Sequence, residues 1–132
     1  MVNYNFRELE LSTRLVIHAG KSADQNDLLV KSAKRNDLLL HTSDPGSPFV
    51  NLGENPAKNE IKEAAVFCAL KSKSWRDNPQ DIIVHSFFKR DCSKGLIRKA
   101  GSWNVRKTIE NIKVKKPEIV KLSKELEDGK TN

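Results

Sequence analysis

The sequence predicts an α+β fold: a single domain with a mostly antiparallel sheet packed against two main helices, followed by a C-terminal helical tail. Strand-like and helix-like segments follow one another in a mixed order, which favours α+β over a regular β-α-β repeat. The length of 132 residues suits one domain with one modest core. No internal repeat or low-complexity block interrupts the chain. We expect the domain to occupy residues 1–115 and a polar helical tail to occupy residues 116–132.

The first part of the chain predicts strands around one capped helix. Ser22 marks the expected helix start, because its hydroxyl can accept a hydrogen bond from a free amide of the first turn. Gln25 stands three residues later, where a capping box places Glu or Gln. Asn36 is the expected end of this helix. The predicted strands are two within residues 3–18, joined by a turn at Ser12-Thr13, and single strands at residues 37–41 and 49–52.

The second part predicts one long helix followed by further strands. Asn55 is the expected N-cap and Pro56 the first helical residue of a helix that runs over residues 57–74. The small residues along it imply close packing against a sheet. The remaining strands are expected at residues 81–88, 103–105 and 109–114, and a last helix at residues 118–128.

Charge favours a polyanionic partner. The formal net charge is +7, and residues 85–109 contain seven Lys and Arg side chains against one acid, Asp91. This excess lies in the folded half of the chain and predicts a defined basic face. The sequence contains no apolar run of the roughly 20 residues that a bilayer span requires. With no signal-like N-terminus either, a cytoplasmic location and no membrane partner are expected.

Two motifs suggest chemistry and then fail closer tests. Gly20-Lys21-Ser22 resembles the end of a phosphate-binding loop, but the glycine that the loop needs five residues earlier is replaced by Leu15. One backbone phosphate at Lys21 remains an alternative. Two distant cysteines, Cys68 and Cys92, predict neither a disulfide scaffold nor a zinc site, so no cofactor or metal is expected.

His41 carries the one enzymatic alternative. Asp44 and Ser47 follow it closely, and these residue types invite a hydrolase or nuclease hypothesis in which His41 acts with Asp44 or Asp37. Closeness along a chain more often means that such side chains bond the backbone of their own turn. No paired carboxylates stand at metal-binding spacing. A non-catalytic protein is therefore expected.

Five short motifs give the chain a likeness to a known family. They are Gly20 with Gln25-Asn26-Asp27, Asp37-Leu38 with His41, Pro45-Gly46-Ser47, Glu63-Ala64-Ala65, and Ser72 with Ser74-Trp75. Their order and spacing resemble the NFACT-R domain of the ribosome quality control factors related to Caliban and fibronectin-binding protein A. The resemblance covers roughly residues 3–114. Leu39 and Pro48 depart from it, because the family pattern has Trp and His there.

The resemblance implies a stand-alone NFACT-R protein that binds structured RNA, a tRNA or rRNA, in a translation-linked role with the ribosome as a further partner. Basic residues would contact phosphates, while amide, imidazole and indole groups would contact bases. The predicted RNA-binding residues are Lys21, Gln25, Asn26, Arg35, His41, Ser47, Lys71, Lys73, Trp75, Lys89, Arg90, Lys94 and Arg98. A protein-interaction subunit that docks through residues 117–128 is the other alternative.

Overall fold

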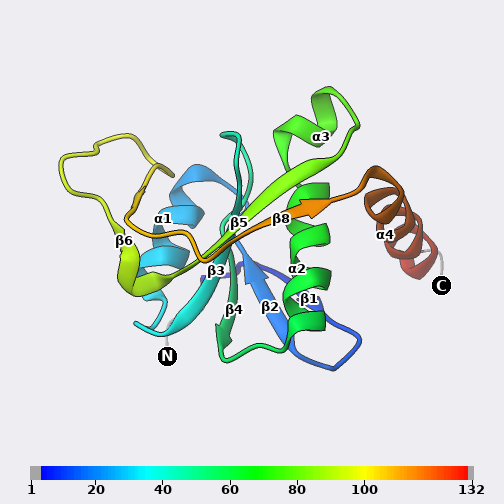
Figure 1. The fold of residues 1–132 in the computed structure, drawn as a ribbon, viewed down its shortest axis with the longest axis horizontal. Coiled ribbons are helices and arrows are strands. Elements are labelled where there is room, and N and C mark those ends of the chain that lie inside the picture. The colour runs from blue at the N-terminus through cyan, green and yellow to red at the C-terminus, as the bar shows by residue number, and fades with distance from the viewer. Residues whose placement is uncertain (1–3, 131–132) are drawn as a thin grey trace.

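Six antiparallel strands form the central sheet of the structure, a computed structural model that describes residues 4–130. Their order across the sheet is β1-β2-β4-β3-β5-β8 (Figure 1). The strands are β1 Arg7–Glu10, β2 Val16–Ala19, β3 Asp37–Thr42, β4 Val50–Glu54, β5 Ile82–Phe88 and β8 Glu110–Val114. Two short strands, β6 Cys92–Ser93 and β7 Asn104–Val105, pair separately after the 3-10 turn η1 Lys89–Asp91. The helices are α1 Ala23–Ser32, α2 Lys58–Leu70, α3 Lys73–Asp77 and α4 Lys116–Lys130. The α+β prediction is confirmed.

Alternate residues of the strands build two hydrophobic clusters, one on each face of the sheet. Leu39 and Phe87 are paired across β3 and β5 and pack with Leu29 of α1. Leu40 instead joins the cluster that contains Ala64 and the other buried residues of α2. Successive side chains of a strand point to opposite faces, so the sheet is sandwiched between α1 and α2 (Figure 1).

The cap of α1 is confirmed, but the helix ends earlier than predicted. The Ser22 hydroxyl accepts a hydrogen bond from the Gln25 amide at 3.2 Å. The last helical residue is Ser32, so the expected end at Asn36 was wrong. The Lys89 ammonium donates to the carbonyl oxygens of Lys31 at 3.3 Å and Ala33 at 3.1 Å, and thereby satisfies acceptors that a helix end leaves free.

The predicted long helix over residues 57–74 is in fact two helices, and its expected cap was wrong. Asn55 has a φ of 55°, a left-handed conformation that an N-cap does not adopt, and Ala57 is the residue that precedes α2. The Ser72 hydroxyl accepts from the Trp75 amide at 3.2 Å and so starts α3. Trp75 lies inside this short helix.

The C-terminal helix packs against the domain. Ile119 is fully buried in the cluster beneath α2, and Leu122 packs against it. Lys62 of α2 forms an ion pair with Glu118 at 3.2 Å. In the part of the chain that the structure describes, no helix, α4 included, is long and apolar enough to cross a membrane.

We predict that Ile119→Ala lowers the free energy of unfolding by about 2–4 kcal/mol, because it removes a buried side chain and leaves a cavity. Lys121→Ala is the matched control, since Lys121 is exposed on the same helix. Urea denaturation followed by circular dichroism measures both. Equal stability of the two variants would mean that α4 is not held by its buried face.

Candidate functional site

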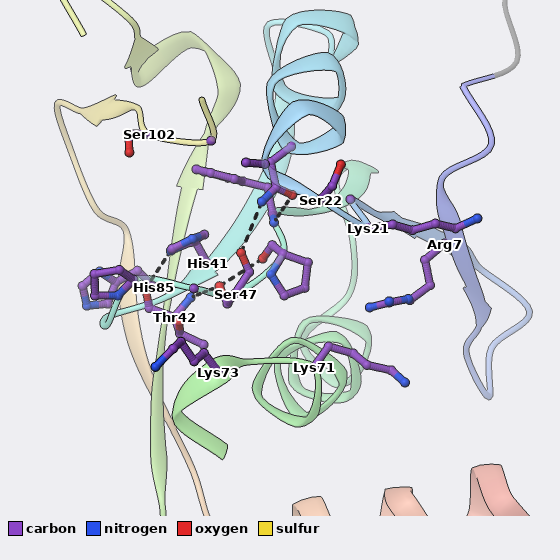
Figure 2. A pocket seen from close by; sticks show the side chains of 18 of the residues that line it. Arg7, Lys21, Ser22, His41, Thr42, Ser47, Lys71, Lys73, His85 and Ser102 are labelled. Carbon is purple, nitrogen blue, oxygen red and sulfur yellow. Dashed lines mark hydrogen bonds between the residues drawn. The ribbon is translucent and has the colours of Figure 1, made fainter. Parts of the chain in front are cut away.

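An open groove of about 1040 Å³ lies where β3 ends, beside the start of α1 and the junction of α2 and α3 (Figure 2). The turn of residues 43–48 crosses it. Segments distant in sequence supply its walls, among them Arg7, the start of α1, the junction around Lys71 and residues 99–105.

Asn26 locks the turn to the start of α1. Its side-chain amide donates to the Ser47 carbonyl oxygen at 3.3 Å, and its Oδ1 accepts from the Phe49 amide at 3.0 Å. Gly20 is required beside it, because an added Cβ would lie 2.1 Å from Asn26 Oδ1. Asn26 is 7% exposed, so its partners have little access to water.

The turn is also fixed from within. The Ser47 hydroxyl accepts from the Thr42 amide and donates to the Pro48 carbonyl oxygen, both at 3.1 Å. Gly46 has a φ of 94°, which favours glycine, and its carbonyl oxygen accepts from the Lys73 amide at 2.8 Å. The Pro-Gly-Ser motif therefore ties the end of β3 to the start of α3.

His41 and His85 are directly opposite each other on β3 and β5, so their side chains share one face of the sheet. The His41 ring lies 4.5 Å from the Phe49 ring, between centroids, and its Nδ1 donates to the Thr42 carbonyl oxygen at 2.8 Å. Burial lowers the pKa of His41, although the bond to Thr42 opposes this. The ring is therefore neutral near pH 7, with Nε2 as an acceptor.

The residues proposed to form a hydrolytic site are engaged elsewhere. Asp44 Oδ2 accepts from the Ser74 hydroxyl at 3.2 Å. Asp37 Oδ2 accepts from the Lys34 amide and from the Asn51 side chain. Within residues 4–130, the structure places no cluster of three or more His, Cys, Asp or Glu side chains that could hold a metal ion. Burial raises the pKa of the Cys68 thiol to about 12.

Residues 94–107, which we call the basic arm, are held against α1 by one carboxylate. Asp27 Oδ1 accepts from the Lys94 ammonium at 3.0 Å, the Gly101 amide at 3.0 Å and the Trp103 indole at 2.9 Å. Burial alone would raise the pKa of Asp27, but these hydrogen bonds and the charge of Lys94 lower it below its usual value. Gly101 allows close approach, since an added Cβ would lie 3.1 Å from that of Ala23.

We predict that Asp27→Asn lowers the free energy of unfolding by about 1–2 kcal/mol at pH 7, because the three donors then meet a neutral amide in place of a carboxylate. The lowered pKa means that the carboxylate contributes fully above the ordinary value of 3.8 and loses this contribution as pH falls through the folded value. The difference from wild type should therefore vanish in acid.

Thermal unfolding between pH 2 and pH 7 checks this result. Asp24→Asn is the matched control, because Asp24 is an exposed acid on the same helix. A stability gap for Asp27→Asn that is constant with pH would contradict the assigned role of the charge.

The groove is strongly cationic. Six basic side chains line it: Arg7, Lys21, Lys71, Lys73, Arg76 and Lys99. Of the lining residues that the structure describes, the single acidic one is Glu127 of α4. Lys73 is partly neutralised by Asp77, at 2.6 Å. The remaining excess creates a positive potential in a concave surface, where field lines concentrate.

The structure brings about half of the sequence-predicted RNA-binding residues to this groove. Those that line it are Lys21, Asn26, His41, Ser47, Lys71 and Lys73. Those outside its lining are Gln25, Arg35, Trp75, Lys89, Arg90, Lys94 and Arg98. The motifs around Gly20, His41 and Pro45-Gly46-Ser47 thus meet at one groove.

Several of the residues outside the groove have contacts within the fold. Lys89 bonds the end of α1, as described above. Arg90 bonds Asn36 at 2.8 Å and lies over the Phe88 ring. Gln25 Nε2 donates to the Tyr4 carbonyl oxygen at 2.9 Å, and Trp75 packs against the cluster under α2.

Five lining residues on which the proposals below depend were missed by sequence reasoning: Arg7, Arg76, His85, Lys99 and Trp103. Lys99 lies in the basic segment and Arg76 beside Trp75, so charge pointed to both without placing them. His85 could be found only through the pairing of β3 with β5, which the sequence does not contain.

The family comparison decides what class of domain this groove belongs to. A family described as the NFACT protein RNA binding domain matches residues 2–95. The chain belongs to this NFACT-R family. The resemblance drawn from the motifs is confirmed, and RNA is the partner class that the family indicates.

A solved structure has the same fold. The C-terminal part of the fibronectin/fibrinogen-binding protein from Streptococcus suis superposes with a TM-score of 0.75 at 23% sequence identity. The match covers 92% of this chain and 49% of that chain, so this NFACT-R chain spans about half of its neighbour's length. A comparison with curated proteins gives no significant match.

The two positions at which the sequence departs from the resemblance are both buried. Leu39 is fully buried between α1 and the sheet, where it packs against Phe87. Pro48 is buried at the groove, and its carbonyl oxygen accepts from Ser47 and from the Cys68 thiol. The family match ends at residue 95, whereas most of the basic arm follows it.

Proposed function

We propose that this NFACT-R chain binds structured RNA, a tRNA or rRNA, in the cationic groove, without catalysing a reaction. The observation that carries the proposal is the excess of six basic side chains over one acid around a concave site. Lys and Arg neutralise phosphates and supply most of the affinity of such interfaces. A translation-linked role on the ribosome in the cytoplasm, in quality control, is proposed from the family.

Neither alternative is favoured by an observation. The His41 ring bonds the Thr42 carbonyl oxygen, and the nearby carboxylates of Asp37 and Asp44 hold other partners. The apolar stripe of α4 that suggested a docking helix places Ile119 in the core of the domain.

The test is RNA binding as a function of salt. We expect log K to fall linearly with log salt concentration, with a slope of roughly −3 to −5 if four to six lysines and arginines meet phosphates. Folded tRNA, an rRNA fragment and a single-stranded RNA of equal length are titrated by fluorescence anisotropy. Absence of binding at low salt, or a flat salt dependence, would remove the proposal.

The same samples test the absence of catalysis. Labelled RNA incubated with the protein and a divalent metal should stay intact. RNA cleavage that disappears in His41→Ala would replace the binding proposal with the nuclease alternative.

A further inference from the structure

Aromatic rings gather at one end of the groove. Five rings line it: His41, Phe49, His85, Phe87 and Trp103. Phe49 and Phe87 are 4% and 2% exposed and meet edge to face with centroids 6.1 Å apart, so they form a buried floor. The two imidazoles and the indole are only partly buried and remain accessible from the groove.

Several basic side chains lie across the groove from the two imidazoles, whereas Lys73 lies on their side and the Lys94 ammonium is 5.1 Å from the centroid of the Trp103 ring. Figure 2 shows Arg7 and Lys21 on the opposite side of the groove from His41 and His85, with Lys71 on a third side. The separation matches the chemistry of a nucleotide, in which a charged phosphate and a flat apolar base are several ångströms apart.

The His41 side chain is arranged to receive a base rather than a phosphate. Its ring is neutral and held by Thr42 and Phe49, so it offers a stacking surface and an acceptor at Nε2. A neutral ring with an acceptor nitrogen repels a phosphate oxygen but accepts the amino or imino group of a base. Rings at the bottom of a concavity are reached by a base that has left its stack, whereas a paired duplex would meet only the rim.

We propose that the end of the groove formed by His41, His85 and Trp103 is a subsite for one unpaired nucleobase, extruded from an otherwise folded RNA. This deepens the proposed RNA binding and rests on it. The cationic side of the groove holds the flanking phosphates, and base stacking on the rings selects unpaired positions without strong preference among bases. Trp103 reaches the subsite because Asp27 holds the basic arm, most of which follows the family match.

Three hairpin RNAs of one stem sequence test the subsite. The first carries a single unpaired uridine, the second an abasic residue at that position, and the third is fully paired. Wild-type protein should bind the first about tenfold more tightly than the other two, as expected for one stacked base. His85→Ala should lower the affinity for the uridine bulge to that for the abasic bulge, and circular dichroism checks that the variant is folded. His18→Ala, a histidine outside the groove that contacts Glu8, should keep the preference.

Two results would overturn the subsite and leave RNA binding in place. One is equal affinity of the wild-type protein for the uridine and abasic bulges. The other is a preference that survives both His85→Ala and His41→Ala. Binding to none of the three RNAs would contradict the proposed function itself.

Crosslinking locates the base directly. With 5-iodouridine at the unpaired position, light should join the RNA to peptides that contain His41, His85 or Trp103. Crosslinks confined to other peptides, for example those with the exposed Leu96, would overturn the assignment.

Discussion

Reversing the charge of three groove lysines, Lys21→Glu, Lys71→Glu and Lys99→Glu together, is expected to lower RNA affinity about 100-fold at low salt. Each lysine that meets a phosphate releases counterions, so the slope of log K against log salt should shrink by roughly 1 per lysine. The loss should be similar for all RNAs that bind, since phosphates carry no sequence information. Anisotropy titrations at several salt concentrations measure both quantities.

A second triple variant separates groove charge from total charge. Lys58→Glu, Lys121→Glu and Lys124→Glu change the net charge by the same amount, and these lysines are exposed residues outside the groove lining. We expect this control to lower RNA affinity by less than about tenfold, against about 100-fold for the groove variant. Equal losses in the two variants would mean that RNA responds to overall charge, and the groove would lose its role.

Reversal of the charges of Lys89, Arg90 and Lys94 is also expected to weaken RNA binding and to reduce the salt slope. The structure adds a second consequence, because Lys89 bonds the end of α1 and Lys94 pairs with Asp27. This variant should lose stability as well. Its unfolding must therefore be measured alongside its RNA affinity.

Asn26→Ala is expected to lower the free energy of unfolding by about 2–4 kcal/mol. The substitution leaves the Phe49 amide and the Ser47 carbonyl oxygen without their partner in a buried site, and each such group costs roughly 1–3 kcal/mol. Chemical denaturation measures the change. Asn36→Ala is the control, because Asn36 is exposed and its side chain accepts a hydrogen bond from the surface residue Arg90.

The effect of Gly20→Ala on stability should depend on whether Asn26 is present. The added methyl group would overlap Asn26 Oδ1, so Gly20→Ala is expected to destabilise the wild-type protein by about 1–3 kcal/mol. In the Asn26→Ala background the overlap with Oδ1 is absent, whereas the backbone nitrogen of residue 26 would still lie 2.9 Å from the added Cβ, so the cost should fall but not disappear. Additive effects of the two substitutions would contradict the direct packing of Gly20 on the Asn26 side chain.

Local features of the chain were predictable because they depend on neighbours in sequence. The Ser22 cap and the strand at residues 81–88 follow from side-chain hydrogen bonding and apolar patterning within a few residues. The predictions failed where a distant residue intervenes. The Lys89 ammonium, far along the chain, donates to a carbonyl oxygen at the end of α1. The predicted long helix is interrupted where the Ser72 hydroxyl caps α3 and the Lys73 amide donates to the Gly46 carbonyl oxygen of a distant turn.

The candidate site was predictable only in part. The motifs identified the family and included Asn26, His41 and Ser47. What each side chain does follows from contacts between elements: Asn26 bonds the Phe49 amide, His41 packs on the Phe49 ring, and Ser47 bonds the Thr42 amide. His85 escaped notice because its place depends on strand register.

By itself, the sequence determined the α+β class, the cap of α1, the net positive charge and the NFACT-R motifs. The tertiary structure decided which of the basic side chains surround a groove and which are used inside the fold. Lys94 and Lys99 are only five residues apart, yet Lys94 is bound by Asp27 while Lys99 lines the groove. The physical reason is that folding brings a carboxylate of α1 within ion-pair distance of Lys94, and a charge paired in this way contributes less to the field around the protein.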